Sequence, residues 1–210
     1  MSAKRVRLPL TEAFLTDLQA GDEVLLSGKV LTARDAAHQR LFELLNTGKP
    51  LPVLLDGKTP QAVPLKEFLQ GQVIYYVGPT PAPEGRPIGS AGPTTAERMD
   101  KYTPRLLDET GLKGLIGKGW RGKAVREALV RNKAVYFAAL TIAAIYGHEN
   151  IRSARVLAFP DLGTEAIREL EFVDFPVFVV NDIYGNDYYE VLAKEKGIPD
   201  PRASKDYHGE

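Results

Sequence analysis

Three short segments combine cationic or hydroxyl side chains with glycine-rich turns or predicted helix starts. In the first, residues 32–38 (TARDAAH), Arg34 falls in the first turn of a predicted helix. Free backbone N–H groups at that end of a helix favour an anion, and a guanidinium pairs with a carboxylate through two hydrogen bonds. A solvated ion pair of Arg34 with Asp35 or Glu43 explains the spacing equally well.

The second segment, residues 92–98 (GPTTAER), ends a long loop and opens another predicted helix. Thr94 and Glu97 have the spacing of a capping box, which would account for these two residues structurally. Capping does not account for Thr95, nor for Arg98, because the helix dipole disfavours positive charge near a helix N-terminus. A bound anion would remove that conflict, so this segment is a second candidate anion site.

The third segment, residues 114–119 (GLIGKG), places Lys118 between two glycines directly after an apolar run. Glycines let a ligand approach the backbone, and the ammonium supplies a movable charge. The segment is not a Walker A loop, because no serine or threonine follows Lys118. Taken alone, a surface lysine in a turn is the simpler explanation. Together, two arginines, a lysine and paired hydroxyls fit a small dianion held at both ends, such as a dicarboxylate.

The composition argues against several other classes of function. The chain has 27 basic and 27 acidic residues, which argues against a nucleic-acid partner or an anionic membrane surface. No apolar run reaches the roughly 18 residues of a transmembrane helix, and the first residues do not form a secretory signal, so we expect a cytoplasmic protein. The chain has no cysteine and only three scattered histidines, so we expect it to bind no metal or cofactor itself.

The elements that must position these segments alternate between strand and helix. After an extended N-terminal arm, the sequence predicts strands at residues 22–31, 73–77, 112–116, 135–140, 154–159 and 172–180. It predicts helices at residues 32–45 (with Thr32 as N-cap and His38 packed within it), 99–109, 122–132 and 142–151. Five prolines and four glycines make residues 78–93 a long loop, and Pro176 indicates an edge strand or a bulge.

These elements predict one mixed α/β domain over residues 1–198, followed by a polar tail at residues 199–210. A separate sheet for the N-terminal strands remains an open alternative.

Four blocks of the chain, in this order, resemble the β subunit or C-terminal domain of class I fumarate hydratases and L-tartrate dehydratases. The blocks are residues 33–38 (ARDAAH), 92–107 (GPTTAERMDKYTPRLL), 114–119 (GLIGKG) and 172–190 (FVDFPVFVVNDIYGNDYYE). The resemblance covers nearly the whole chain, and the shared order makes it more specific than any one block.

This resemblance implies a fold, a partner and a set of roles. The fold would be a swivelling β/β/α domain like the mobile domain of aconitases. A 4Fe–4S cluster would be bound by the cysteines of a separate α subunit, in a heterotetramer of two αβ pairs. Arg34, Arg98 and Lys118 would bind the substrate carboxylates. Thr94 would be the catalytic residue at the carbon that gains or loses a proton, helped by an acidic residue of the α chain, with Thr95 beside it as a further substrate ligand.

The implied reaction is the reversible hydration of fumarate to L-malate. The alternatives from the same family are dehydration of L-tartrate to oxaloacetate and hydration of methylfumarate. A different class of function is a stand-alone carboxylate-binding module without a partner. The joint presence of Arg34, Thr94, Arg98 and Lys118 argues against that alternative, because a degenerate relative should have lost at least one of them.

Overall fold

A computed structural model describes residues 2–140 and 149–197 of the chain. The predicted tail at residues 199–210 and most of the helix predicted at residues 142–151 lie outside the described residues. Within the described ranges, no helix is both long and apolar enough to cross a membrane.

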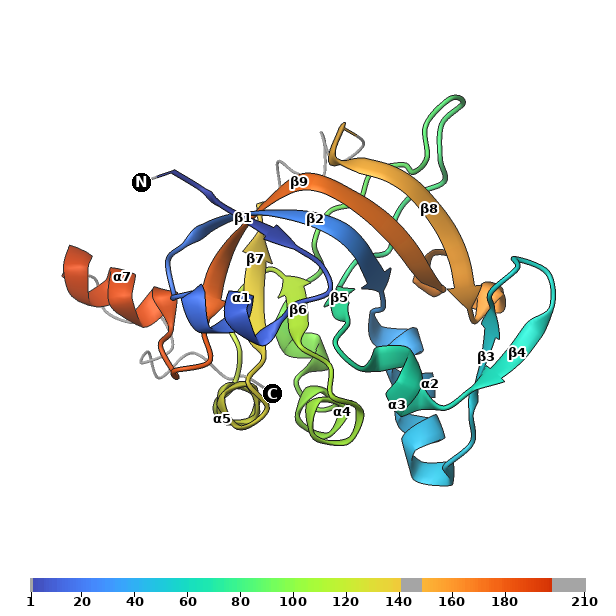
Figure 1. The fold of residues 1–210 in the computed structure, drawn as a ribbon, viewed down its shortest axis with the longest axis horizontal. Helices are drawn as coiled ribbons and strands as arrows, with labels where there is room; N and C mark the ends of the chain where they lie inside the picture. The colour runs from blue at the N-terminus through green and yellow to red at the C-terminus, as the bar shows by residue number, and fades with distance from the viewer. Residues whose placement is uncertain (1, 141–148, 198–210) are drawn as a thin grey trace.

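Seven strands form one mixed sheet in the order β1-β2-β5-β6-β7-β9-β8. They are β1 (Lys4–Arg7), β2 (Glu23–Thr32), β5 (Val73–Tyr75), β6 (Gly114–Gly117), β7 (Val135–Ala139), β8 (Ile151–Ala158) and β9 (Ile167–Asn181). A further pairing of β2 with β9 closes β2, β5, β6, β7 and β9 into a five-stranded barrel. In Figure 1, the long strands β2, β8 and β9 arch across the top of the molecule.

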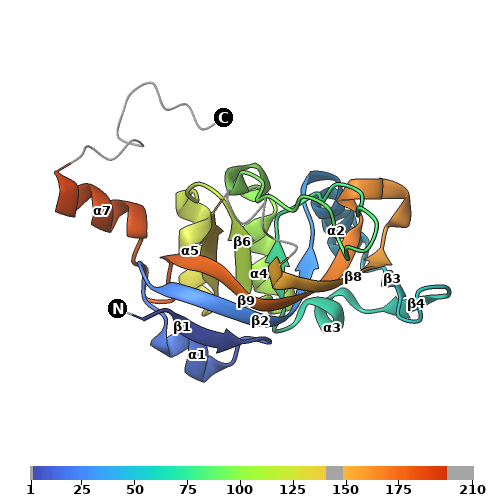
Figure 2. The same ribbon diagram turned by 90° about the horizontal axis from the view of Figure 1, so that it is seen from above.

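The helices and a small second sheet surround this barrel. The helices are α1 (Glu12–Asp17), α2 (Asp35–Thr47), α3 (Leu65–Leu69), α4 (Thr103–Thr110), α5 (Lys123–Arg131) and α7 (Tyr188–Lys196), with 3₁₀ helices η1 (Ala96–Met99) and η2 (Pro160–Glu165). Strands β3 (Leu51–Leu54) and β4 (Pro60–Val63) form the second sheet. Figure 2 shows α1 and β1 on one side of β2 and β9, and α4 and α5 on the other.

Strand direction determines where a site can form. Strands β2, β5, β6 and β7 run parallel to one another, whereas β9 is antiparallel to β2 and β7. The segments that follow β2, β5 and β6 therefore emerge at the same end of the barrel. In parallel sheets, ligands bind at the carboxyl ends of the strands. The three segments singled out in the sequence all approach this end, which we call the carboxyl rim.

The barrel strands are buried on both faces. Along β5 and the residue after it, Ile74 and Tyr76 face the helices, whereas Val73 and Tyr75 point into the barrel with the stacked aromatic rings of β9. A strand buried on both sides must be apolar at every position, which explains the uninterrupted run VIYYV.

Most predicted elements are confirmed, with shifted bounds. The helix predicted at residues 32–45 is α2, and it ends at Gly48, which has a left-handed conformation with φ of 65°. Thr32 is not its N-cap. Thr32 is the last residue of β2, and its hydroxyl donates to Ala166 O (3.2 Å) and accepts from the backbone N–H of Arg168 (2.9 Å). The helix predicted at residues 99–109 is divided, because Pro104 lies in the first turn of α4.

Other expectations are corrected by the sheet. The N-terminal strands belong to the main sheet, and the separate sheet is β3–β4. The extended arm contains the short helix α1, whose N-cap Thr11 accepts from Phe14 N. Pro176 is not in an edge strand, since β9 pairs with β2, β7 and β8. The alternative, a bulge, is confirmed nearby, where the β2–β9 register shifts and Asp174 has φ of 49°.

Candidate functional site

Backbone hydrogen bonds bring the second and third segments together at the carboxyl rim. Thr94 N donates to Tyr76 O (2.7 Å), just beyond β5, and Lys118 N donates to Thr94 O (3.1 Å). Ala96 N in turn donates to Lys118 O (2.9 Å), so Thr95 and Lys118 form a parallel β-bridge. Residues 94–96 thus extend the sheet alongside the end of β6, which fixes the two threonines next to Lys118.

Arg34 reaches the same rim from the end of β2. Its Nη2 lies 3.1 Å from Glu165 Oε1, and its Nε lies 3.5 Å from Asp35 Oδ2 without forming a hydrogen bond. The guanidinium crosses the first residue of the long loop, because a Cβ on Gly78 would come within 2.7 Å of Nη1. Gly78 therefore provides the space in which the arginine lies.

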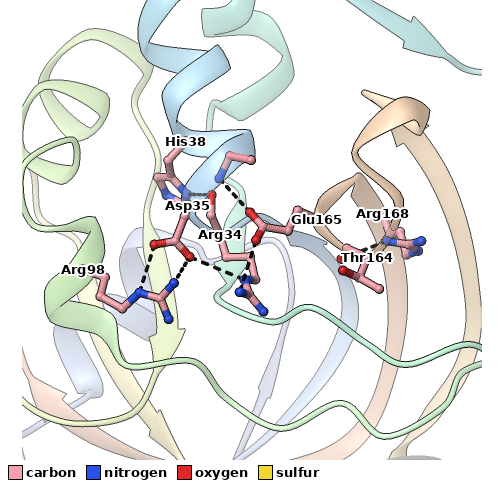
Figure 3. A network of polar contacts seen from close by, with 8 residues as sticks. Arg34, Asp35, His38, Arg98, Thr164, Glu165 and Arg168 are labelled. Carbon is pink, nitrogen blue, oxygen red and sulfur yellow. Dashed lines mark hydrogen bonds and ion pairs between the residues drawn. The ribbon is translucent and has the colours of Figure 1, made fainter.

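Asp35 joins Arg34 to Arg98. Arg98 Nε and Nη2 donate to the two carboxylate oxygens of Asp35, at 3.0 and 2.5 Å. Figure 3 shows Asp35 between the two guanidinium groups, with Arg98 reaching it from η1. The ion pair of Arg34 with Asp35 that the sequence allowed is thus present. The second carboxylate that pairs with Arg34 belongs to Glu165 and not to Glu43. The two arginines therefore face one carboxylate, that of Asp35, and lie close together.

The remaining predicted residues are exposed or half-buried. The side chain of Lys118 is exposed, and it has no ion-pair partner among the residues that the structure describes. Thr94 and Thr95 are half-buried, and the capping box predicted for Thr94 and Glu97 is wrong, because η1 begins after Thr95 without a side-chain cap. The rim thus carries three cations and two hydroxyls beside the carboxylates of Asp35 and Glu165.

A buried arginine behind the rim was missed from the sequence. Arg121 is fully buried and donates from Nε to Asp100 Oδ1 (2.8 Å), from Nη1 to Tyr76 Oη (3.2 Å) and from Nη2 to Thr103 Oγ1 (2.8 Å). Asp100 also accepts from Gly122 N (2.6 Å). Burial raises the pKa of the Asp100 carboxyl, and the Arg121 guanidinium opposes that rise. This pair connects the end of η1, which carries Arg98, to the loop that follows Lys118.

His38 supports Arg34 from inside α2, which confirms that it packs within its helix. The ring is fully buried between Tyr76 and Tyr102, and Nδ1 lies 2.9 Å from Arg34 O. Since a carbonyl oxygen can only accept, Nδ1 carries the hydrogen. Burial lowers the pKa of His38 to about 4, so the ring is neutral near pH 7.

This burial predicts a pH-dependent stability. In the unfolded chain His38 binds a proton below about pH 6.5, but in the folded chain it does so only near pH 4. The contribution of neutral His38 to the unfolding free energy is therefore fully present above pH 6.5 and falls as the pH drops toward 4. Between pH 7 and pH 5 the wild-type chain should lose about 2 kcal/mol more of its unfolding free energy than His38→Gln. Urea unfolding of both proteins at the two pH values measures this difference. Parallel pH profiles would contradict a buried neutral His38.

Comparison with protein families identifies the family of this chain. The family model described as Fumarase C-terminus matches residues 1–192. The chain belongs to this family.

Among its relatives, Fumarate hydratase 2 of Leishmania major is 38% identical over 176 residues, which are 83% of this chain and 28% of the relative. The anaerobic class I fumarate hydratase of Escherichia coli (strain K12) is 33% identical over 185 residues, or 88% of this chain and 31% of the enzyme. The chain thus spans about a third of the fumarate hydratases that it matches. A putative L(+)-tartrate dehydratase subunit beta of Methanocaldococcus jannaschii is 31% identical over 191 residues, covering 89% of this chain and 91% of that subunit.

The residues of this Fumarase C-terminus chain do not fit an iron–sulfur cluster or another metal. The sequence has no cysteine, and within residues 2–140 and 149–197 no group of three or more His, Asp or Glu side chains is arranged to hold a metal ion. The chemistry available at the rim is recognition of carboxylates by charge and of hydroxyls by hydrogen bonds.

Proposed function

We propose that this chain is the β subunit of a hydro-lyase that reversibly hydrates fumarate to L-malate. The observation that carries the proposal is the meeting of Arg34 and Arg98 at Asp35 on the rim where Lys118 adjoins Thr94 and Thr95. Three cations against the two carboxylates of Asp35 and Glu165 leave one positive charge for an incoming dianion, and both ends of fumarate or malate are carboxylates.

The roles proposed for the rim residues rest on the chemistry of their side chains and on their positions at the carboxyl rim. Arg34, Arg98 and Lys118 bind the two carboxylates of the substrate, and Thr95 donates a further hydrogen bond. Thr94, whose carbonyl accepts from the backbone N–H of Lys118, would lie at the carbon that gains or loses a proton. A threonine hydroxyl is a weak base without help. An acidic group of a partner therefore completes the proton transfer, and Thr94 orients the reacting carbon.

A separate α subunit is part of the proposal. It would hold the 4Fe–4S cluster through its own cysteines, and two αβ pairs would form the heterotetramer. The support is the absence of cysteine here and the match to a relative that is itself a subunit, over 91% of its length. We further infer that residues 1–198 move as one swivelling β/β/α domain against that subunit, as the mobile domain of aconitases does.

The likeness to the Methanocaldococcus jannaschii subunit favours L-tartrate dehydration as the second candidate activity. Methylfumarate has one methyl group more than fumarate, and tartrate has one hydroxyl group more than malate. A pocket distinguishes such groups by shape and by hydrogen bonds to the hydroxyl, and the partner would build part of that pocket.

Anaerobic co-expression with an α subunit from the same source, followed by cluster reconstitution, tests both candidates. The complex should dehydrate L-malate, and each chain alone should not. If the complex turned over a tartrate faster than malate, the assigned activity would be L-tartrate dehydration instead of fumarate hydration. An intact, cluster-loaded complex that turns over neither malate, fumarate, methylfumarate nor either tartrate would refute the proposed activity.

A further inference from the structure

Glu165 is a carboxylate at the rim that no predicted role includes. Its Oε1 lies 3.1 Å from Arg34 Nη2, and its Oε2 accepts from Ala36 N at 2.7 Å, in the first turn of α2. Figure 3 shows it reaching from the end of η2 to both groups. The side chain is 21% exposed, so solvent weakens this pairing less than it weakens an ion pair on the open surface.

The backbone on either side of Glu165 is fixed by hydrogen bonds. Arg168 donates to the carbonyls of Gly163 (2.8 Å), Thr164 (3.3 Å) and Ala166 (3.4 Å), so its guanidinium closes the turn around Glu165. Thr32, at the end of β2, donates to Ala166 O (3.2 Å). Glu165 is thus held by the strand that leads into Arg34 and lies against the helix that follows it.

Arg34 needs such a support. An arginine side chain has about 2 kcal/mol of rotamer entropy, which a substrate would otherwise have to overcome on binding. The ion pair with Glu165 holds one side of the Arg34 guanidinium, and the close approach to Gly78 limits the movement of the other side. Donor groups that are already held in place bind a carboxylate with a smaller entropic cost.

We propose that Glu165 is a positioning residue that fixes the Arg34 guanidinium for the substrate carboxylate, an inference that rests on the proposed function. The opposite role is also chemically reasonable: Glu165 would occupy the place of the substrate carboxylate and compete with it. The two roles predict opposite changes in KM when the charge is removed.

The chain provides a matched control in the same 3₁₀ helix. Asp161 pairs with Arg40 of α2 (Nη1 to Oδ1, 2.8 Å), on the outer surface and away from the rim. Glu165→Gln keeps an oxygen that can accept from Ala36 N but removes the ion pair with Arg34. Asp161→Asn makes the same chemical change to an ion pair between the same two elements.

In the αβ complex, Glu165→Gln should raise KM at least tenfold for whichever substrate the wild type turns over, with a smaller change in kcat. Asp161→Asn should leave both constants within twofold of the wild type. A lower KM in Glu165→Gln would overturn the positioning role and establish competition. Equal effects of the two substitutions would also overturn it, because they would indicate a general loosening of η2.

A second readout does not depend on turnover, so the inference can fail separately from the proposed function. In the full chain labelled with ¹⁵N-arginine, the guanidinium of Arg34, assigned by its loss in Arg34→Lys, should rotate slowly about Nε–Cζ. Glu165→Gln should increase this rate at least tenfold, whereas Asp161→Asn should affect Arg40 alone. An unchanged Arg34 signal in Glu165→Gln would refute the positioning role even if no substrate is turned over.

Discussion

Arg98→Ala and Lys118→Ala should each abolish turnover of the dicarboxylate while leaving the fold intact. Both side chains are exposed, and neither contributes to the core. In the substrate complex the ion pairs of these side chains with the substrate would be buried. Removing one partner of a buried, hydrogen-bonded charge pair costs about 2–5 kcal/mol, which corresponds to a loss of roughly thirtyfold or more in kcat/KM. Steady-state kinetics of the αβ complex, with urea unfolding of each variant, measures both parts of the prediction.

Two substitutions elsewhere on the surface provide controls. Arg131 makes a bidentate pair with Asp108 and is 54% exposed, close to the 49% of Arg98, so Arg131→Ala removes a similar ion pair outside the rim. Lys133 is an exposed lysine paired with Glu12, just before β7 begins at the other end of the barrel, and Lys133→Ala is the control for Lys118→Ala. The assigned site would be wrong if both rim variants kept activity within tenfold of the wild type, a change of about 1.4 kcal/mol.

The largest effect on stability should come from Arg121→Met. This substitution leaves the largely buried carboxylate of Asp100 without its charge partner, and it removes the donors that Tyr76 and Thr103 accept from. Breaking a buried pair by deleting one member costs about 3–5 kcal/mol. Denaturant unfolding should show a loss of that size, and turnover should fall as well, because the pair connects η1 to the loop after Lys118.

A double-mutant cycle separates the orphaned charge from the lost packing. In the wild type, Asp100→Asn should destabilise the chain, because it weakens the bonds to Arg121 and Gly122. In the Arg121→Met background, the same substitution should stabilise the chain, because it removes an unpaired buried charge. A change of less than about 1 kcal/mol in Arg121→Met would show that the pair is not important for folding.

The sequence was sufficient for the elements whose signals are local. Apolar runs identified most strands of the sheet, and α2 and α4 end at the glycines Gly48 and Gly111, close to the predicted ends of these helices. Pairing between distant segments had no local signal. The closure of the barrel by β2 and β9 therefore could not be predicted, nor could the position of Pro176 in a strand with three neighbours.

The candidate site, too, could be predicted only where its signals are local. Arg98 stood out because a positive charge near a helix N-terminus conflicts with a simple structural explanation, whereas Arg34 and Lys118 were candidates only in combination with it. Two of the carboxylates that meet the arginines lie far from them in sequence: Arg98 pairs with Asp35 across 63 positions, and Arg34 pairs with Glu165. Nothing in the sequence indicates that Arg121 is buried, because its burial depends on residues of other segments. These are Tyr76, just after β5, and Tyr136, in β7.

The closure of the barrel also determines when the chain can fold. Residues 23–31 of β2 pair with residues 169–178 of β9, so β2 leaves the ribosome long before the strand with which it pairs. Contacts between such distant segments form slowly, and the edge of β2 that β9 will cover stays unpaired until β9 has been synthesised. An exposed strand edge is a template for wrong pairing. The nascent chain is therefore most prone to aggregation before β9 emerges, and a ribosomal stall upstream of residue 167 would prolong that exposure.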